Sequence, residues 1–219
     1  YINRSLLLDY IMSNKMVGIL MSIGAILLFA LFAGLWPAGQ TDPGIENARL
    51  LAANNLTIFY LFIGGLSFSM MQTGTFILAE KLIKKADSTY KTLLVFCKLA
   101  FAATLTMFIT SGSLWAASAS LYSSGDVTSA GIVSILANGA TSLLPWIWGS
   151  GMLILGLAAI SGSSKPKNTI EWTKGLFIIS GLVFILSPFI SQIAFPAWAI
   201  NTVVFVVIGA LLATEKIDF

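Results

Sequence analysis

The chain has 219 residues, of which 57% are apolar and only 10% charged, and its formal net charge is +3. A soluble domain is nearer to about 50% apolar and about 25% charged, and a water-soluble fold of this length could not bury roughly 125 apolar side chains (57% of 219). Since one membrane span needs about 20 apolar residues, the composition excludes soluble and disordered proteins. It predicts a single all-α domain, a polytopic membrane helix bundle with six transmembrane helices.

Six apolar runs separated by polar or turn-forming segments account for these helices. Pro37 follows the first run, and Pro196 is expected to form a tight turn before the last one, because proline interrupts helical hydrogen bonding. A charged hairpin is expected over 80–91 and a serine-rich loop over 116–126. The predicted spans are about 16–36, 56–79, 92–115, 141–161, 175–193 and 197–213.

A short helix is predicted near 42–54, between the first two spans. Asp42 followed by Pro43 is typical of an N-cap with proline in the first helical turn. Apolar residues then recur at helical spacing, as in an amphipathic helix that lies on a membrane surface: Ile45, Ala48, Leu51 and Ala52.

A second short helix is predicted near 127–138. Residues 127–161 are almost continuously apolar, and as one helix they would be about 52 Å long. This exceeds the ~30 Å hydrocarbon core of a bilayer. We therefore expect a break at Asn138-Gly139 or Pro145, with an interfacial or re-entrant helix before it.

Basic residues and tryptophans predict the orientation. Lysine and arginine number two before the first span, then one, four, none, three and none in the successive loops, and one in the tail. Cytoplasmic loops are enriched in these residues, so both termini are predicted to be cytoplasmic. Tryptophans favour the membrane interface, and five of the six fall at predicted outer ends: Trp36, Trp115, Trp146, Trp148 and Trp198.

Residue types that carry chemistry are scarce. There is no histidine, which excludes histidine-ligated metals and haem, and the single Cys97 can form neither an intramolecular disulfide nor a cluster site. No phosphate-binding loop or nucleophile motif is present. We expect no enzyme activity, no cofactor and no metal. The positive charge is explained by the loops, so no nucleic-acid partner is expected.

Three polar side chains lie at predicted membrane depth in spans two and three. Gln72 is the deepest amide, while Thr106 and Thr110 continue a small polar stripe along span three. They could form a polar conduit between the two spans. The alternative is ordinary interhelical hydrogen bonding, worth about 0.6 kcal/mol per contact.

Lys98 is the one lysine inside a predicted span. An intramembrane lysine can serve as a Schiff-base site or a proton relay. Lys98 lies close to the cytoplasmic side, however, so its side chain can extend to the interface or pair with Glu80 across the hairpin. We favour the last two interpretations, extension to the interface or pairing with Glu80, over a Schiff-base site or a proton relay.

Trp146 and Trp148 follow Pro145 and precede Gly149 and Gly151. Two indoles at one span end could contact a lipid or a partner, or shape a pocket. The alternative is an aromatic anchor followed by a close helix crossing at the glycines.

The layout resembles the DUF4386-type family of uncharacterised six-span prokaryotic membrane proteins. The similarity covers about 16–213 and includes a short basic hairpin before span three and an apolar helix before span four. Its other pieces are the surface helix, Glu46-Asn47-Ala48 to Leu51-Ala52-Ala53, and the glycine-rich run Gly149-Ser150-Gly151-Met152-Leu153-Ile154-Leu155-Gly156 leading to Lys165-Pro166-Lys167 and Gly175. The resemblance implies a multi-pass protein of the prokaryotic cytoplasmic membrane and brings no activity.

These observations favour an accessory or structural subunit of a larger membrane complex, in contact with the lipid bilayer and with other membrane protein subunits. Met12 resembles a natural start, which makes 1–11 an uncertain part of the mature chain. A small-solute transporter or channel that uses the Gln72 seam is the alternative. A lipid-modifying enzyme with a site near Asp126 is a third hypothesis.

Overall fold

A computed structural model describes residues 13–38, 42–161, 166–190 and 194–219. Within these ranges every regular element is helical, which confirms the predicted all-α class. The elements are α2 (Asn14–Ala30), the π-helix η1 (Leu31–Leu35), α3 (Ile45–Ala53), α4 (Thr57–Lys85), α5 (Ser88–Ser123), α6 (Val127–Gly139), α7 (Leu144–Ile160), the 3-10 helix η3 (Ile170–Gly175), α8 (Leu176–Leu186) and α9 (Ala194–Ala213).

Five helical segments of the described chain are long and apolar enough to cross a membrane. They are Asn14–Leu35, Thr57–Lys85, Ser88–Ser123, Val127–Ile160 and Phe195–Ala213. The predicted span 175–193 differs: α8 has 11 residues and its helix ends at Leu186. Turns follow from Ser187 to Phe189, around Pro188, and residues 191–193 lie outside the described ranges.

The predicted break after the second short helix is confirmed. α6 ends at Gly139 and α7 begins at Leu144 with Pro145 in its first turn, where the missing proline N–H costs nothing. α6 itself folds back along α5 after the turn at Ser124 and Gly125. Two serine hydroxyls of α5 donate to α6 carbonyl oxygens there: Ser111 to Ala137 at 2.7 Å and Ser118 to Ala130 at 2.8 Å.

α4 and α5 both extend beyond their predicted bounds. Most of the predicted hairpin 80–91 and of the predicted serine-rich loop 116–126 is therefore helical. α4 continues to Lys85, so the hairpin turn contains only Ala86 and Asp87, and the Asp87 carboxylate caps α5 by accepting from the Tyr90 N–H. α5 continues to Ser123 through the supposed serine-rich loop. The loop prediction failed because the contacts of this segment with α3 and α6 outweigh the weak helix propensity of serine.

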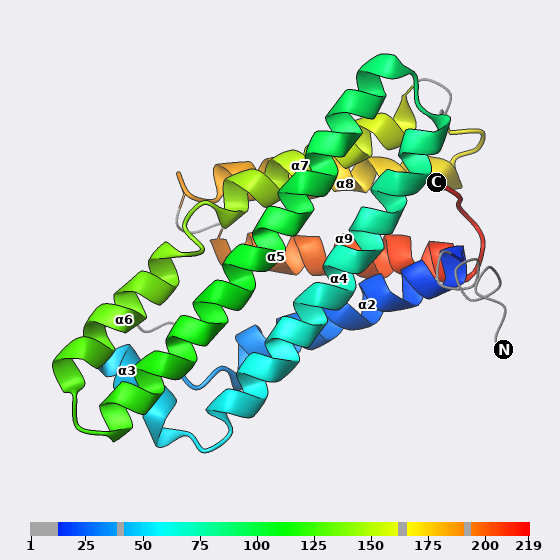
Figure 1. The fold of residues 1–219 in the computed structure, drawn as a ribbon. Coiled ribbons are helices and arrows are strands. Elements are labelled where there is room, and N and C mark those ends of the chain that lie inside the picture. Colours follow the sequence, from blue (N-terminus) through cyan, green and yellow to red (C-terminus); the bar gives the residue numbers. More distant parts are fainter. Residues whose placement is uncertain (1–12, 39–41, 162–165, 191–193) are drawn as a thin grey trace, which may run out of the picture.

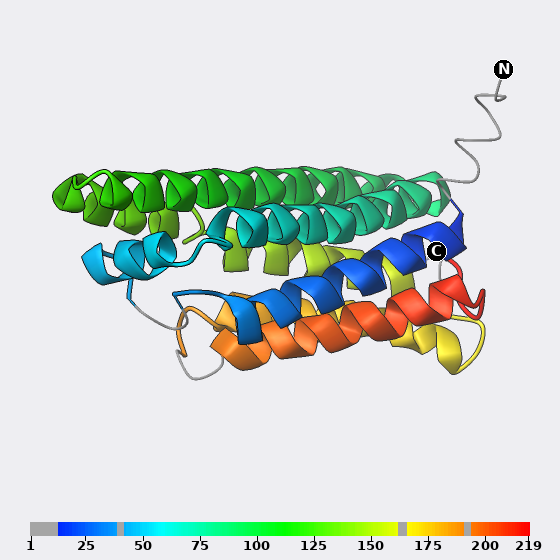
Figure 2. The ribbon, with the colours of Figure 1, turned by 90° about the horizontal axis from the view of Figure 1, so that it is seen from below.

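The described chain ends meet at one end of the bundle (Figure 1). α4 and α5 form a long antiparallel pair, α2 packs between α4 and α9, and α7 packs against α5 and α8. Seen from below, α3 and α6 gather at the opposite end, beside the last turns of α5 (Figure 2).

Glycines allow the closest helix crossings. A Cβ at Gly149 would lie 2.7 Å from the Gly181 carbonyl oxygen, and a Cβ at Gly181 would lie 2.6 Å from that of Gly149. Since any side chain here would force α7 and α8 apart, this crossing agrees with the close packing expected after the tryptophan pair.

Two local predictions were wrong. α3 begins at Ile45 with Gly44 as its N-cap, not at Asp42, because Gly44 adopts φ 148°, outside the helical region. Pro196 lies inside the first turn of α9 and not in a turn before it, which a proline tolerates because that N–H has no helical partner.

Candidate functional site

Gln72 is buried between α4 and α5, and its partner is Thr104. The Gln72 Nε2 donates to Thr104 Oγ1 at 2.9 Å, and Thr104 Oγ1 donates to the Phe101 carbonyl oxygen at 3.0 Å. Thr75 Oγ1 lies 3.4 Å from Gln72 Oε1 and 3.0 Å from the Gln72 carbonyl oxygen. All three polar side chains are at most 3% exposed. They satisfy one another, so they tie two helices together and offer no open row of polar groups to a solute.

Thr106 and Thr110 do not join this contact, which corrects the predicted seam. Both are exposed, and Thr106 Oγ1 donates to the Ala102 carbonyl oxygen of its own helix at 3.1 Å. Thr104 and Thr106 are two residues apart, and at about 100° per residue their side chains leave α5 on opposite sides. The residue that faces Gln72 is therefore Thr104, which the sequence reading missed.

The outward face of α5 changes in character along its length. Near the hairpin it presents large apolar side chains, and Phe96 and Leu99 are 55% and 64% exposed. Farther along, the exposed residues are small except for Ile109, which is 49% exposed. We name this second part the α5 stripe; its members are Ala102, Thr106, Thr110, Ser113 and Ala117. Only 28% of an 18-residue apolar stretch of α5 is buried within the chain. This is the smallest share among the corresponding stretches of the five long segments.

Lys98 pairs with Glu80, as one of the interpretations predicted. The Lys98 ammonium forms an ion pair with the Glu80 carboxylate, and its Nζ also lies 4.5 Å from the centre of the Phe76 ring. The two charged side chains are 23% and 35% exposed. A lysine held by a carboxylate and an aromatic face has a structural role across the α4–α5 hairpin.

Trp146 and Trp148 lie on opposite sides of α7. Trp146 is 41% exposed and packs on Phe189 at 5.1 Å between ring centres. Trp148 is fully buried, with its ring centre 4.7 Å from that of Phe68 and 6.0 Å from that of Trp198. Of these two tryptophans, only Trp146 can therefore contact a lipid or a partner. Trp148 is a core residue, because two residues along a helix reverse the facing direction.

Asn201 of α9 is a second buried amide. It is 1% exposed, and its Oδ1 accepts from Ser180 Oγ at 2.8 Å, which ties α9 to α8. Among the described residues, the Nδ2 of Asn201 and the Nε1 of Trp148 are the buried side-chain donors without an acceptor.

A cavity of about 540 Å³ is lined by Asn47 of α3 and Asn138 of α6, so it lies toward the end of the bundle that carries these two helices. We name it the aromatic cavity. α2 and η1, α5, α7 and α9 supply its walls. Seven of its eighteen lining residues are aromatic, and these rings include Phe32, Trp36, Phe108, Trp115 and Trp198. Its polar lining comes from Asp42, Asn47, Asn138, Thr141 and Thr202.

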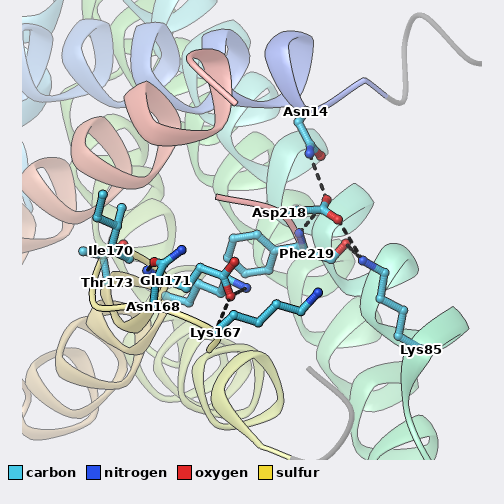
Figure 3. Close-up of polar contacts among 10 residues, drawn as sticks. Asn14, Lys85, Lys167, Asn168, Ile170, Glu171, Thr173, Asp218 and Phe219 are labelled. Carbon is cyan, nitrogen blue, oxygen red and sulfur yellow. Dashed lines mark hydrogen bonds and ion pairs between the residues drawn. The ribbon is translucent and has the colours of Figure 1, made fainter. Parts of the chain in front are cut away.

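The opposite end of the bundle is closed by charged groups and by the folded-back tail. Figure 3 shows Asp218 between two neighbours, accepting from the Asn14 amide at 2.9 Å and pairing with Lys85 at 3.0 Å. Lys85 Nζ also donates to the Phe219 carbonyl oxygen at 2.8 Å. Ile217 and Phe219 are each 2% exposed. We name Asn14, Lys85 and Asp218 the tail cluster.

Two groups in this region have pKa values below their ordinary range. Burial works to raise the pKa of Asp218, but the hydrogen bonds from Asn14 and Lys85 outweigh it and leave that pKa below its ordinary value. Lys174 is 4% exposed beneath the Phe219 ring, and burial lowers its pKa although Glu171 opposes the change. Both groups fix the tail against η3 and α4.

Metal-ligating and nucleophilic groups are not clustered in the part of the chain that the structure describes. No group of three or more potential ligand side chains occurs there, and Cys97 is buried with its thiol directed at the Gly151 carbonyl oxygen at 3.1 Å. No family model, no curated protein and no solved structure matches the chain. The layout resemblance to the DUF4386-type proteins therefore stays an expectation.

Proposed function

We propose that this chain is a non-catalytic multi-pass membrane protein that acts as an accessory or structural subunit of a larger membrane complex. The observation that carries the proposal is the α5 stripe: a row of small side chains that faces away from the rest of the chain. Small residues at helical spacing allow two membrane helices to approach closely.

The two halves of the outward α5 face support this assignment. Large apolar side chains, as at Phe96 and Leu99, suit contact with acyl chains. A helix face exposed only to lipid has no need for five small residues at intervals of three or four, and three of them carry hydroxyl groups that can bond across a helix pair. We therefore propose that another membrane helix packs on the α5 stripe.

We further propose six spans with both termini in the cytoplasm. The fifth span would be α8, whose 11 residues rise about 16 Å at ~1.5 Å per residue. Both ends of the described chain lie at the same end of the bundle, as an even number of crossings requires. Lys81 and Lys85 of the hairpin contact Asn14 and Asp218 there, in keeping with a basic cytoplasmic side.

The remaining assignments rest on the layout resemblance and on composition. We propose the cytoplasmic membrane of a prokaryote as the location, with lipid and other membrane subunits as partners and no nucleic acid. The transporter alternative has less support than the subunit assignment, because Gln72 is paired with Thr104 and because Thr106 and Thr110 face outward.

Co-purification from native membranes tests the subunit assignment. The protein with Thr106→Trp and Thr110→Trp is compared with a variant that carries Phe96→Trp and Leu99→Trp, on the large-residue half of the same helix. We expect the wild type and the second variant to migrate in a native gel as a complex, and the first variant to migrate as a lone chain. A wild-type protein that migrates alone, or a complex that survives the stripe substitutions, would contradict the proposal.

A further inference from the structure

The aromatic cavity combines an apolar interior with a single charged group. Trp36 and Trp115 pack on each other at 5.1 Å between ring centres, and Phe32 lies 5.2 Å from Trp36 and 6.0 Å from Phe108. The rings thus form a continuous wall, and the cavity volume of about 540 Å³ falls within the range of about 300–1,000 Å³ that is typical of small-molecule sites.

Charge restricts the ligand. Asp42 is exposed at the cavity and brings a carboxylate, while no lysine or arginine is among the described residues that line it. An anionic head group would meet this carboxylate without a compensating cation. A cationic head group would be attracted both by Asp42 and by the negative faces of the neighbouring indole rings.

The backbone of η1 shapes this wall. α2 changes from α- to π-helix at Leu31–Leu35, and Phe32 and Ala33 of this segment, together with the following Trp36, line the cavity. A π-helical turn holds an extra residue, is less stable than an α-helical one and is frequently found at functional sites. The π-helix η1 therefore supports a functional site here independently of the cavity's volume and of its charge.

An exposed aromatic ring favours access from the bilayer. Phe195 lines the cavity and is 52% exposed. The alkyl part of an amphiphile can therefore contact an apolar wall of the cavity from the bilayer.

We infer that the aromatic cavity is a binding site for a cationic amphiphile, with its alkyl part between the aromatic walls and its ammonium group at Asp42. The site is distinct from the α5 stripe, because the stripe residues do not line it. Loss of one function therefore leaves the other measurable.

Photo-crosslinking in lipid nanodiscs tests the site with three probes of equal alkyl length that carry a diazirine in the chain. Their head groups are trimethylammonium, hydroxyl and sulfate. Crosslinked peptides are identified by mass spectrometry. We expect the ammonium probe to label peptides from η1 and the first half of α9 most strongly, the alcohol less and the sulfate least.

Three variants locate the binding determinants. Thr202→Trp places an indole in the cavity and should reduce labelling by every probe at least tenfold. Its matched control is Thr214→Trp, beyond the other end of α9, where the exposed threonine makes the same type of bond to the carbonyl four residues back; labelling should be unchanged. Asp42→Asn should lower ammonium labelling severalfold and leave alcohol labelling intact.

Two outcomes would overturn the inference. One is sulfate labelling equal to ammonium labelling, since that would remove the role of Asp42. The other is labelling that persists in Thr202→Trp while circular dichroism and the unfolding midpoint match those of the wild type. If Thr202→Trp fails to fold, the head-group preference and its loss in Asp42→Asn still decide the question.

Discussion

The two faces of α5 differ in whether their polar groups find partners within the chain. On the inward face, Thr104 bonds Gln72, while Ser111 and Ser118 bond carbonyl oxygens of α6. On the outward face, Thr106 can bond only its own helix and Thr110 is exposed. A polar side chain in a long apolar helix therefore has two distinct roles: the inward groups join the helices of this chain, and the outward ones suit a helix from another chain.

The largest contrast is expected for two phenylalanines of α5. Phe101 is 1% exposed and Phe96 is 55% exposed. Phe101→Ala should lower the free energy of unfolding by about 3–5 kcal/mol, because it leaves a cavity in the core. Phe96→Ala should change it by no more than about 0.5 kcal/mol. Unfolding of the detergent-solubilised protein by dodecyl sulfate measures both; equal losses would show that the two faces have been assigned incorrectly.

A smaller contrast is expected for the two threonines. Thr104→Val removes the acceptor of the buried Gln72 amide and should cost about 1 kcal/mol, within the range measured for hydrogen bonds between membrane helices. Thr106→Val removes only a bond to its own helix and should be neutral in the isolated chain. The same unfolding assay applies, and a neutral Thr104→Val would contradict the proposed role of Gln72.

The hairpin ion pair should contribute less. Glu80→Gln breaks the contact with Lys98, but both side chains are partly exposed, and such pairs contribute at most about 1 kcal/mol. We expect a small decrease in stability and retained assembly. A loss of assembly with unchanged stability would give Lys98 a functional role instead.

The smallest effect is a pH dependence confined to the tail. The folded-state pKa of Asp218 is lowered, so its contribution is complete above the ordinary aspartate pKa of about 3.9 and is lost as the pH falls through the folded value. The protection of the tail amides against hydrogen exchange, measured relative to the intrinsic exchange rate at each pH, should therefore decrease below about pH 4. Asp218→Asn should abolish this acid dependence, whereas Glu215→Gln should preserve it.

The sequence predicts what depends on composition and on breaks in the apolar runs. The helical class, the cores of the long segments and the interruption between Gly139 and Leu144 all follow from apolar length and from residues that stop helices. The Lys98–Glu80 contact is predictable for a similar reason: the short turn between α4 and α5 places residues at similar distances from it side by side.

Which side of a helix faces inward could not be predicted. α5 carries small polar residues on both faces and α7 is apolar on all sides, so the sequence period gives no direction and distinguishes neither Thr104 from Thr106 nor Trp146 from Trp148. The folded-back tail was also missed. Ile217 and Phe219 alternate with Asp218, and this alternation is the one signal that two apolar side chains would turn inward while the carboxylate faced the lysines.

Site-specific photo-crosslinking from α5 in native membranes tests the central claim most directly. A photoreactive amino acid is placed at Thr110, in the α5 stripe, or at Phe96, on the large-residue half of the same face. The account predicts a protein adduct of defined mass from position 110 and only lipid adducts from position 96. Lipid adducts alone from both positions would contradict it.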